Sequence, residues 1–229
     1  MEKRGISQEG LKVLACVTML LDHVGAVFYP GCLWLRAVGR LAFPLYCFLL
    51  VEGAAHTRNM ERYGLRLLIG AVLSEIPFDL LFYGRITWAH QSVMVTLLLG
   101  LVMIGWARAR KRYAVLPFCV CFFAAEFLNA DYGGWGIALI GLFLFTAEVS
   151  REKLWQFIGM ALIFWLMDSA DIAVFGWRIP VQMFGLLAMV PIALYSGRKQ
   201  TENKAVQWGF YLFYPVHLTV LYWIGGFLG

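Results

Sequence analysis

Apolar segments about as long as a membrane is thick fill nearly the whole chain, and this pattern restricts the fold more than any other feature. A bilayer core of roughly 30 Å is crossed by about 20 apolar residues in a helix. Segments near that length alternate with short polar breaks along all 229 residues, and 61% of the residues are hydrophobic whereas 14% are charged. The sequence therefore predicts an all-α, polytopic integral membrane protein with a single domain, residues 1–229, and no soluble domain.

The lengths of the apolar segments indicate nine membrane-spanning helices. They are residues 11–29, 34–55, 64–83, 92–107, 113–129, 133–149, 154–169, 179–196 and 206–228. The first segment contains Asp22 and His23, and no small-residue cleavage pattern follows it. We therefore expect this segment to belong to the mature fold rather than to a signal peptide.

Basic residues cluster at the N-terminus and in every second loop, which predicts the orientation of the chain. The clusters are residues 2–4, 58–66, 108–112, 151–153 and 198–199, and the intervening loops carry few basic residues. By the positive-inside rule, the N-terminus is then cytoplasmic and, with nine spans, the C-terminus lies outside. The net charge of +5 follows from these loops, so we expect membrane lipids as partners and no nucleic acid.

Ionisable side chains inside the expected spans are the candidate functional residues, because a charged group in a bilayer is costly and is usually functional. Asp22 and His23 are adjacent in the first span, and their side chains point about 100° apart around the helix. Lys12 stands eleven residues before His23, on nearly the same helix face and roughly 16 Å away along the axis. The other such residues are Arg40, Glu52, His56, Glu75, Asp79 and His217.

Several of these residues also have a structural interpretation, and His217 by itself is typical of a hydrogen-bonded core residue. Lys12 can extend to the inner headgroups, and Arg40 with Asp79 can form a buried ion pair. Glu52 and His56 are four residues apart and can form a local surface pair. The number of ionisable groups inside the spans favours function over packing. We expect Arg40 and Asp79 to be the neighbours that close around Asp22 and His23.

The chemistry open to this set of residues is limited. An imidazole beside carboxylates suits a general base that deprotonates an amine or hydroxyl before it attacks an activated acyl group. Basic groups at the inner mouth suit the phosphates of an acyl donor. The sequence contains no zinc-ligand spacing, Walker loop, dinucleotide fingerprint or nucleophile elbow, so no metal is expected. A proton-coupled transporter or flippase would use the same residues, and a structural subunit for envelope assembly is a third possibility.

Short motifs in a fixed order along the chain resemble those of one family. They are LLDHVG at 20–25, GRLAFPL at 39–45, EG at 52–53, HTRN at 56–59, SEIPFDL at 74–80 and YPVH at 214–217. Together they make the sequence similar to the TraX family, which is known for N-terminal acetylation of conjugative pilin. The family resembles in turn the wider group of membrane-bound acyltransferases, whose first span carries a basic residue and a histidine separated by ten positions, as Lys12 and His23 are.

This resemblance implies a multi-pass acetyltransferase of the bacterial inner membrane. It would move an acetyl group from cytoplasmic acetyl-CoA to a peptide or pilin N-terminus, a sugar or a lipid headgroup. The resemblance implies that His23 is the catalytic base and Asp22 its partner. The implied donor-binding residues are Lys12, His56, Arg58, Arg62 and Arg66, where the three arginines match the paired-arginine motif of the related group only approximately. The implied cavity and acceptor residues are Arg40, Glu52, Glu75, Asp79 and His217.

Overall fold

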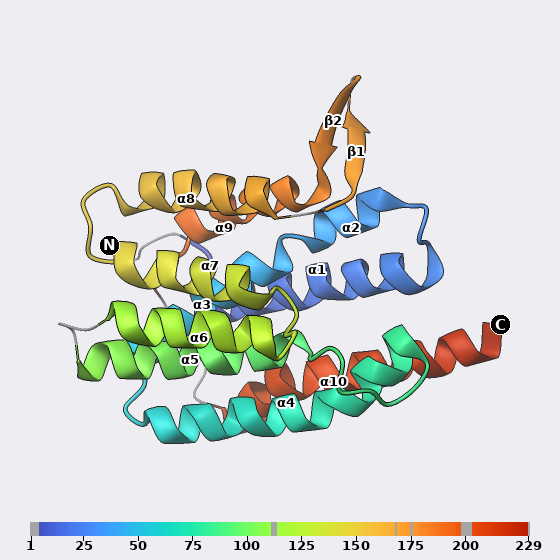
Figure 1. Cartoon of the computed structure of the whole chain (residues 1–229), viewed down its shortest axis with the longest axis horizontal. Helices are drawn as coiled ribbons and strands as arrows, with labels where there is room; N and C mark the ends of the chain where they lie inside the picture. The colour runs from blue at the N-terminus through green and yellow to red at the C-terminus, as the bar shows by residue number, and fades with distance from the viewer. Residues whose placement is uncertain (1–4, 111–113, 168, 175, 198–202, 229) are drawn as a thin grey trace. The chain divides into compact units, whose positions relative to one another are not determined.

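A computed structural model of the chain describes residues 5–110, 114–167, 169–174, 176–197 and 203–228, which are mostly helical (Figure 1). In chain order the elements are α1 (Gln8–Phe28), α2 (Leu33–Gly39), α3 (Ala42–His56), α4 (Met60–Tyr83), α5 (Val93–Ala109), α6 (Val115–Phe127), α7 (Gly133–Thr146), α8 (Glu152–Leu166), β1 (Asp171–Val174), β2 (Trp177–Pro180), the 3₁₀ helix η2 (Val181–Ala188), α9 (Met189–Ala193) and α10 (Lys204–Leu228). Helical structure therefore occurs within each of the nine predicted apolar segments.

Three helical segments are long and apolar enough to cross a membrane, namely Gln8–Phe28, Leu33–His56 and Ala205–Phe227. Shorter apolar helices cover Val93–Ala109, Val115–Phe127, Gly133–Thr146 and Val181–Ala193. The lengths and apolar composition of these helices are typical of a membrane protein. The basic residues at 2–4, 111–112 and 198–199, which contributed to the predicted orientation, lie outside the described residues.

The chain divides into two compact units. The first comprises residues 1–49 and 150–210, and the second comprises residues 50–149 and 211–229. Helices α3 and α10 each begin in the first unit and end in the second. Each unit therefore combines segments that are far apart in the sequence.

In the first unit, α1 packs against α2, while α2 and α8 both pack against η2. The side chain of Ser7 caps α1 by accepting a hydrogen bond from the backbone N–H of Gly10, at 3.1 Å. Glycines allow α1 and α2 to approach closely, because a Cβ atom at Gly25 would lie 2.7 Å from Cβ of Leu35. The end of α1 is thus held directly against the start of α2.

The second predicted span is interrupted at Arg40 and Leu41, where α2 ends and α3 begins. Pro44 has no N–H group, so it leaves the carbonyl of Arg40 without the hydrogen bond that would continue the helix. That carbonyl lies 3.2 Å from the position of a Cβ atom at Gly185 in η2. Arg40 therefore lies at the junction between α2 and α3 and keeps helical dihedral angles, φ of −58° and ψ of −17°.

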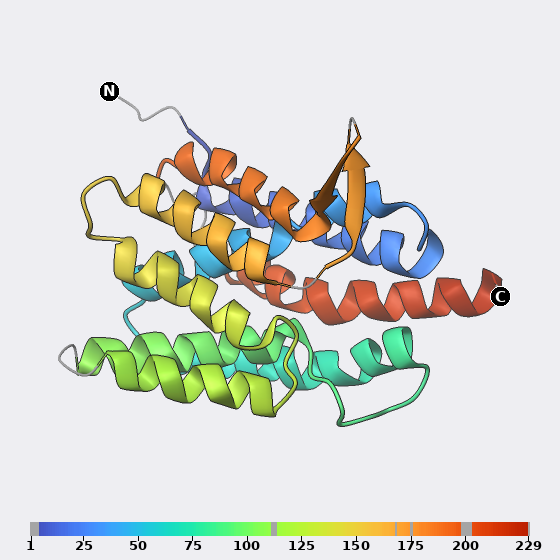
Figure 2. The same ribbon diagram turned by 45° about the horizontal axis from the view of Figure 1, so that its top comes forward.

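An antiparallel hairpin stands where the sequence predicted a loop without strands. Its strands β1 and β2 pair Asp171 with Pro180 and Val174 with Trp177, and Figures 1 and 2 show the hairpin projecting from the helices of the first unit. Gly176 in the turn has φ of +85°, a conformation that glycine adopts without steric cost. The all-α expectation is wrong for this short segment, and helical structure in the 179–196 span begins only after β2.

In the second unit, α5 packs against α4, α6 and α7, and α6 packs against α7. The core between these helices contains fully buried aliphatic side chains such as Ile104, Ile137 and Ile140. The carboxylate of Glu126 accepts a hydrogen bond of 2.7 Å from the backbone N–H of Gly134, which stabilises the positive N-terminal end of α7. The side chain of Arg108 likewise donates to the carbonyl of Ala54 near the end of α3.

Candidate functional site

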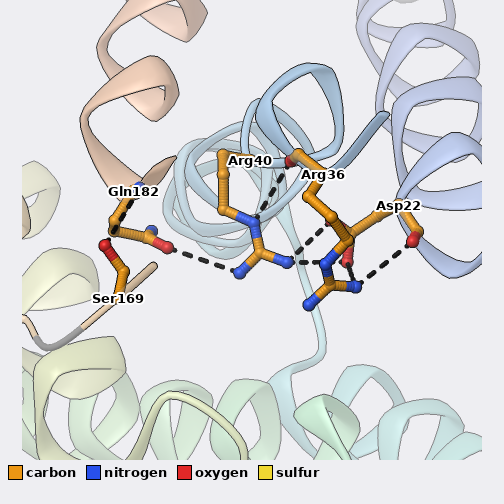
Figure 3. A network of polar contacts seen from close by, with 5 residues as sticks. All are labelled: Asp22, Arg36, Arg40, Ser169 and Gln182. Carbon is orange, nitrogen blue, oxygen red and sulfur yellow. Dashed lines mark hydrogen bonds and ion pairs between the residues drawn. The ribbon is translucent and has the colours of Figure 1, made fainter. Parts of the chain in front are cut away.

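Asp22 on α1 lies between two arginines of the α2 segment (Figure 3). Arg40 Nη2 lies 2.7 Å from Oδ1 and 2.8 Å from Oδ2 of Asp22, and Arg36 Nη1 lies 2.8 Å from Oδ2. The side chains of Asp22, Arg40 and Arg36 are 13%, 15% and 30% exposed. The ion pairs are therefore largely shielded from solvent, which makes them stronger than surface pairs.

The local sequence explains this geometry. Arg36 and Arg40 are four residues apart, so one face of the α2 segment presents both guanidinium groups. Gly39 stands between them, and a Cβ atom there would overlap the side chain of Asp22. The absence of a side chain at Gly39 thus lets Asp22 reach both arginines.

The network continues from Arg40 to the segment after the hairpin. Arg40 Nη1 donates to Gln182 Oε1 at 3.4 Å, and the backbone N–H of Gln182 donates to Ser169 Oγ at 3.5 Å (Figure 3). Gln182 is 2% exposed, and its Nε2 has no hydrogen-bond partner among the described residues. The site therefore combines two guanidinium groups with one buried amide donor.

His23 and Lys12 lie on the same helix as Asp22. His23 is half-buried and follows Asp22 directly, and the ammonium group of Lys12 lies 5.3 Å from the centre of the Phe210 ring. The two oxygens of Asp22 accept hydrogen bonds from Arg36 and Arg40, so this carboxylate fixes the α2 segment. Its expected role as the partner of His23 stays a prediction.

The second unit holds the expected carboxylate pair of α4, Glu75 and Asp79. Ser92 donates to Glu75 Oε1 from its hydroxyl at 2.7 Å and from its backbone N–H at 3.2 Å. The backbone N–H of Thr87 donates to Asp79 Oδ2 at 2.8 Å. Asp79 therefore accepts a hydrogen bond from the loop between α4 and α5, and Glu75 accepts hydrogen bonds from the residue directly before α5.

His217 is buried in α10. Its Nδ1 donates to the carbonyl of Phe213 at 2.7 Å, and its ring stacks on that of Phe213 with 4.8 Å between centroids. Proline at position 215 lacks the N–H group that a helix would use there. Electrostatic interactions connect Tyr214 with Glu75 and Asp131, so this part of α10 belongs to the same neighbourhood as the carboxylates.

The expected donor-binding residues of the second unit are of two kinds. One kind is exposed near the facing ends of α3 and α4, namely His56, Arg58 and Arg62. His56 Nδ1 lies 3.5 Å from Glu52 Oε1, so these two residues form the expected local pair. Arg66 is half-buried, with its guanidinium carbon 5.7 Å from the centres of both the Tyr63 and the Tyr211 rings. This arrangement holds the Arg66 side chain against aromatic surface.

Sequence reasoning missed Arg36, Gln182 and Asp131. The spacing of Arg36 and Arg40, which places both on one helix face, is the signal that could have revealed Arg36, whereas no local pattern marks Gln182. Among the described residues, no group of three His, Cys, Asp or Glu side chains is placed to hold a metal ion.

The sequence profile of the family described as "TraX protein" matches residues 7–225, nearly the whole chain. The chain belongs to the TraX family. One relative is described as probable fimbrial assembly protein FimC, serogroup H1, of Dichelobacter nodosus, and it is 32% identical over 227 residues, which cover 92% of each chain. An uncharacterized protein of Rickettsia prowazekii (strain Madrid E) is 28% identical over 160 residues, which cover 67% of this chain and 61% of that protein.

No solved structure matches this TraX protein. The resemblance to TraX that rested on short motifs is confirmed, while the more distant link to other membrane-bound acyltransferases stays a prediction.

Proposed function

We propose that this TraX protein is a membrane-bound acetyltransferase that moves an acetyl group from cytoplasmic acetyl-CoA to an acceptor in or across the membrane. Family membership and the fimbrial assembly name of a relative support this proposal. The observation that carries it is the largely buried network of Asp22, Arg36 and Arg40 directly beside His23. An ionic network in an apolar helix bundle is costly to build, and such sites usually serve function.

His23 is the general base in this proposal. It takes the proton from the acceptor's amine or hydroxyl while the lone pair of that group attacks the acetyl carbonyl carbon. The carbon–sulfur bond then breaks, the acetyl group stays on the acceptor, and coenzyme A leaves as the thiol after it receives a proton. The network of Asp22 and the two arginines positions the end of α1 that carries His23.

The remaining residues take the parts that the TraX resemblance implies. The phosphates of acetyl-CoA are anionic, and the basic side chains proposed to contact them are Lys12, His56, Arg58, Arg62 and Arg66. The polar residues proposed to line the path of the acceptor are Arg40, Glu52, Glu75, Asp79 and His217. We place the protein in the bacterial inner membrane with nine spans and a cytoplasmic N-terminus, in accordance with its basic loops.

Coenzyme A binding is the direct test of this proposal. A ligand that binds only the folded state raises the unfolding temperature, so coenzyme A at saturating concentration should stabilise the purified protein in detergent. Pantetheine, which has the thiol arm of coenzyme A but lacks its adenine nucleotide and all of its phosphates, is the control ligand and should give a smaller shift. Absence of any shift with coenzyme A, together with substrate flux in reconstituted vesicles, would contradict the proposal and favour a transporter or flippase.

The acceptor is found by mass spectrometry of envelope material from cells with and without the protein. An acetyl group adds about 42 Da, and a pilin or other peptide, a glycan and a lipid headgroup are separated before analysis. Loss of this increment from one fraction identifies the acceptor class. Identical acetylation of all three fractions in the two strains would contradict the proposed activity.

A further inference from the structure

Two carboxylates of the second unit, Glu75 and Asp79, lack a lysine or arginine ion-pair partner among the described residues. Glu75 and Asp79 are four residues apart on α4, and like charges at this spacing repel each other. Their electrostatic neighbours include each other, His90 and Tyr214 beside Glu75, and Tyr83 beside Asp79. Arg85, in the loop between α4 and α5, is exposed.

Asp79 is the more deeply buried of the two carboxylates, because this residue is only 2% exposed. Its Oδ2 accepts the hydrogen bond from Thr87, but its Oδ1 is buried and has no hydrogen-bond partner among the described residues. A buried oxygen without a partner costs free energy. An N–H or O–H donor from outside the chain would satisfy this oxygen.

An aromatic ring interacts electrostatically with each carboxylate, that of Tyr83 with Asp79 and that of His90 with Glu75. Phe78 precedes Asp79 and is buried, and its ring lies 6.4 Å from that of His90 and 6.1 Å from that of Tyr83, centre to centre. Tyr83 and His90 lie 6.1 Å apart. Carboxylates beside aromatic faces are the combination that recognises organic ammonium groups, because the ring faces attract positive charge and the carboxylates accept N–H hydrogen bonds.

We propose that Glu75 and Asp79 bind a primary ammonium group carried on an organic substituent, with Asp79 Oδ1 as the acceptor of one N–H hydrogen bond. A bare metal ion suits the site less well, since the described His, Cys, Asp and Glu side chains include no group of three that surrounds one point. The inference concerns binding alone and does not rest on acetyl transfer. The ammonium group belongs either to a soluble amine or to a lipid such as phosphatidylethanolamine, and the test separates these two sources.

The probe is benzylammonium, and the matched control ligand is benzyl alcohol, which has nearly the same shape and no charge. Benzylammonium should raise the unfolding temperature of the purified protein, and benzyl alcohol and equimolar sodium chloride should not. Asp79→Asn and Glu75→Gln keep the size of each side chain and should each weaken benzylammonium binding at least tenfold. Asp171→Asn, at an exposed carboxylate of β1, should leave binding unchanged.

Two results would overturn the proposal. One is an equal response of the wild-type protein to benzylammonium and to benzyl alcohol or sodium chloride, which needs no variant and so remains decisive if a substitution prevents folding. The other is undiminished binding by folded Asp79→Asn and Glu75→Gln proteins. To find the source, binding is compared in nanodiscs of phosphatidylglycerol with and without phosphatidylethanolamine. Competition by the ethanolamine lipid assigns the site to a headgroup, and undiminished binding assigns it to a soluble amine.

Discussion

Arg40 holds Asp22 through a single nitrogen, since Nη2 lies 2.7 Å from one carboxylate oxygen and 2.8 Å from the other. Arg36 binds differently, because its Nη1 contacts Oδ2 at 2.8 Å and also the backbone carbonyl of Asp22 at 3.2 Å. One arginine therefore orients the carboxylate, and the other joins the side chain and backbone of Asp22. Together they fix the end of α1 that carries His23.

Replacing Asp22 by Asn should destabilise the protein. The change leaves two guanidinium groups without their shared carboxylate, and we expect a loss of roughly 2 to 4 kcal/mol, below the full cost for a completely buried pair because the side chains keep some exposure. Thermal or denaturant unfolding in detergent measures this loss. Asp171→Asn removes an exposed carboxylate and is the matched control. Equal stability of the two variants would show that the network contributes little.

The two arginines should couple to Asp22 with unequal strength. Arg40 contacts both oxygens and is 15% exposed, whereas Arg36 is 30% exposed. Double-mutant cycles with Asp22→Asn and either Arg40→Lys or Arg36→Lys measure each coupling, and we expect the Arg40 value to be the larger by about 1 kcal/mol. Equal couplings, or a larger one for Arg36, would contradict the geometry.

Gly39→Ala should disturb the contact between α1 and α2. The new methyl group would overlap the side chain of Asp22, and we expect a loss of about 1 to 3 kcal/mol, as for other overpacked positions. Gly209→Ala is the matched control, since apart from its chain neighbours and the nearby backbone of α10 no atom of the described residues lies within 4 Å of its Cβ position. That change should be neutral or slightly stabilising, because alanine favours a helix over glycine by about 1 kcal/mol. Comparison of the two unfolding midpoints checks the prediction, which fails if Gly39→Ala is harmless.

The positions of the helices could be predicted because apolar segments of the right length are a signal that the sequence carries directly. The hairpin at 171–180 could not, because its strands have four residues each and lie between two apolar segments. The ends of α6 and α7 were predicted two and three residues too late, because apolar residues such as Leu128 and Val149 continue into the turns beyond these helices. Pro44 indicates a possible break between α2 and α3, but a proline near a helix start is also compatible with an unbroken helix. The break therefore could not be predicted from this residue alone.

The candidate site was predictable only in part. Asp22, Arg40 and Asp79 stood out as charges inside apolar segments. Arg36 did not, because a basic residue near the expected start of a span is usually assigned to the headgroups. The hydrogen bond from Thr87 to Asp79 depends on the conformation of a loop, which residue spacing does not specify.

The acetyl-transfer proposal is tested most directly by the incorporation of labelled acetyl groups from acetyl-CoA into inverted membrane vesicles, which expose their cytoplasmic face. Vesicles containing the wild-type protein should incorporate label, and those with His23→Ala should do so about a hundredfold more slowly, since a general base contributes at least this factor. Gly209→Ala is the control variant, and equal unfolding temperatures verify that His23→Ala is folded. Incorporation by folded His23→Ala at the wild-type rate would contradict the role of His23 as the catalytic base.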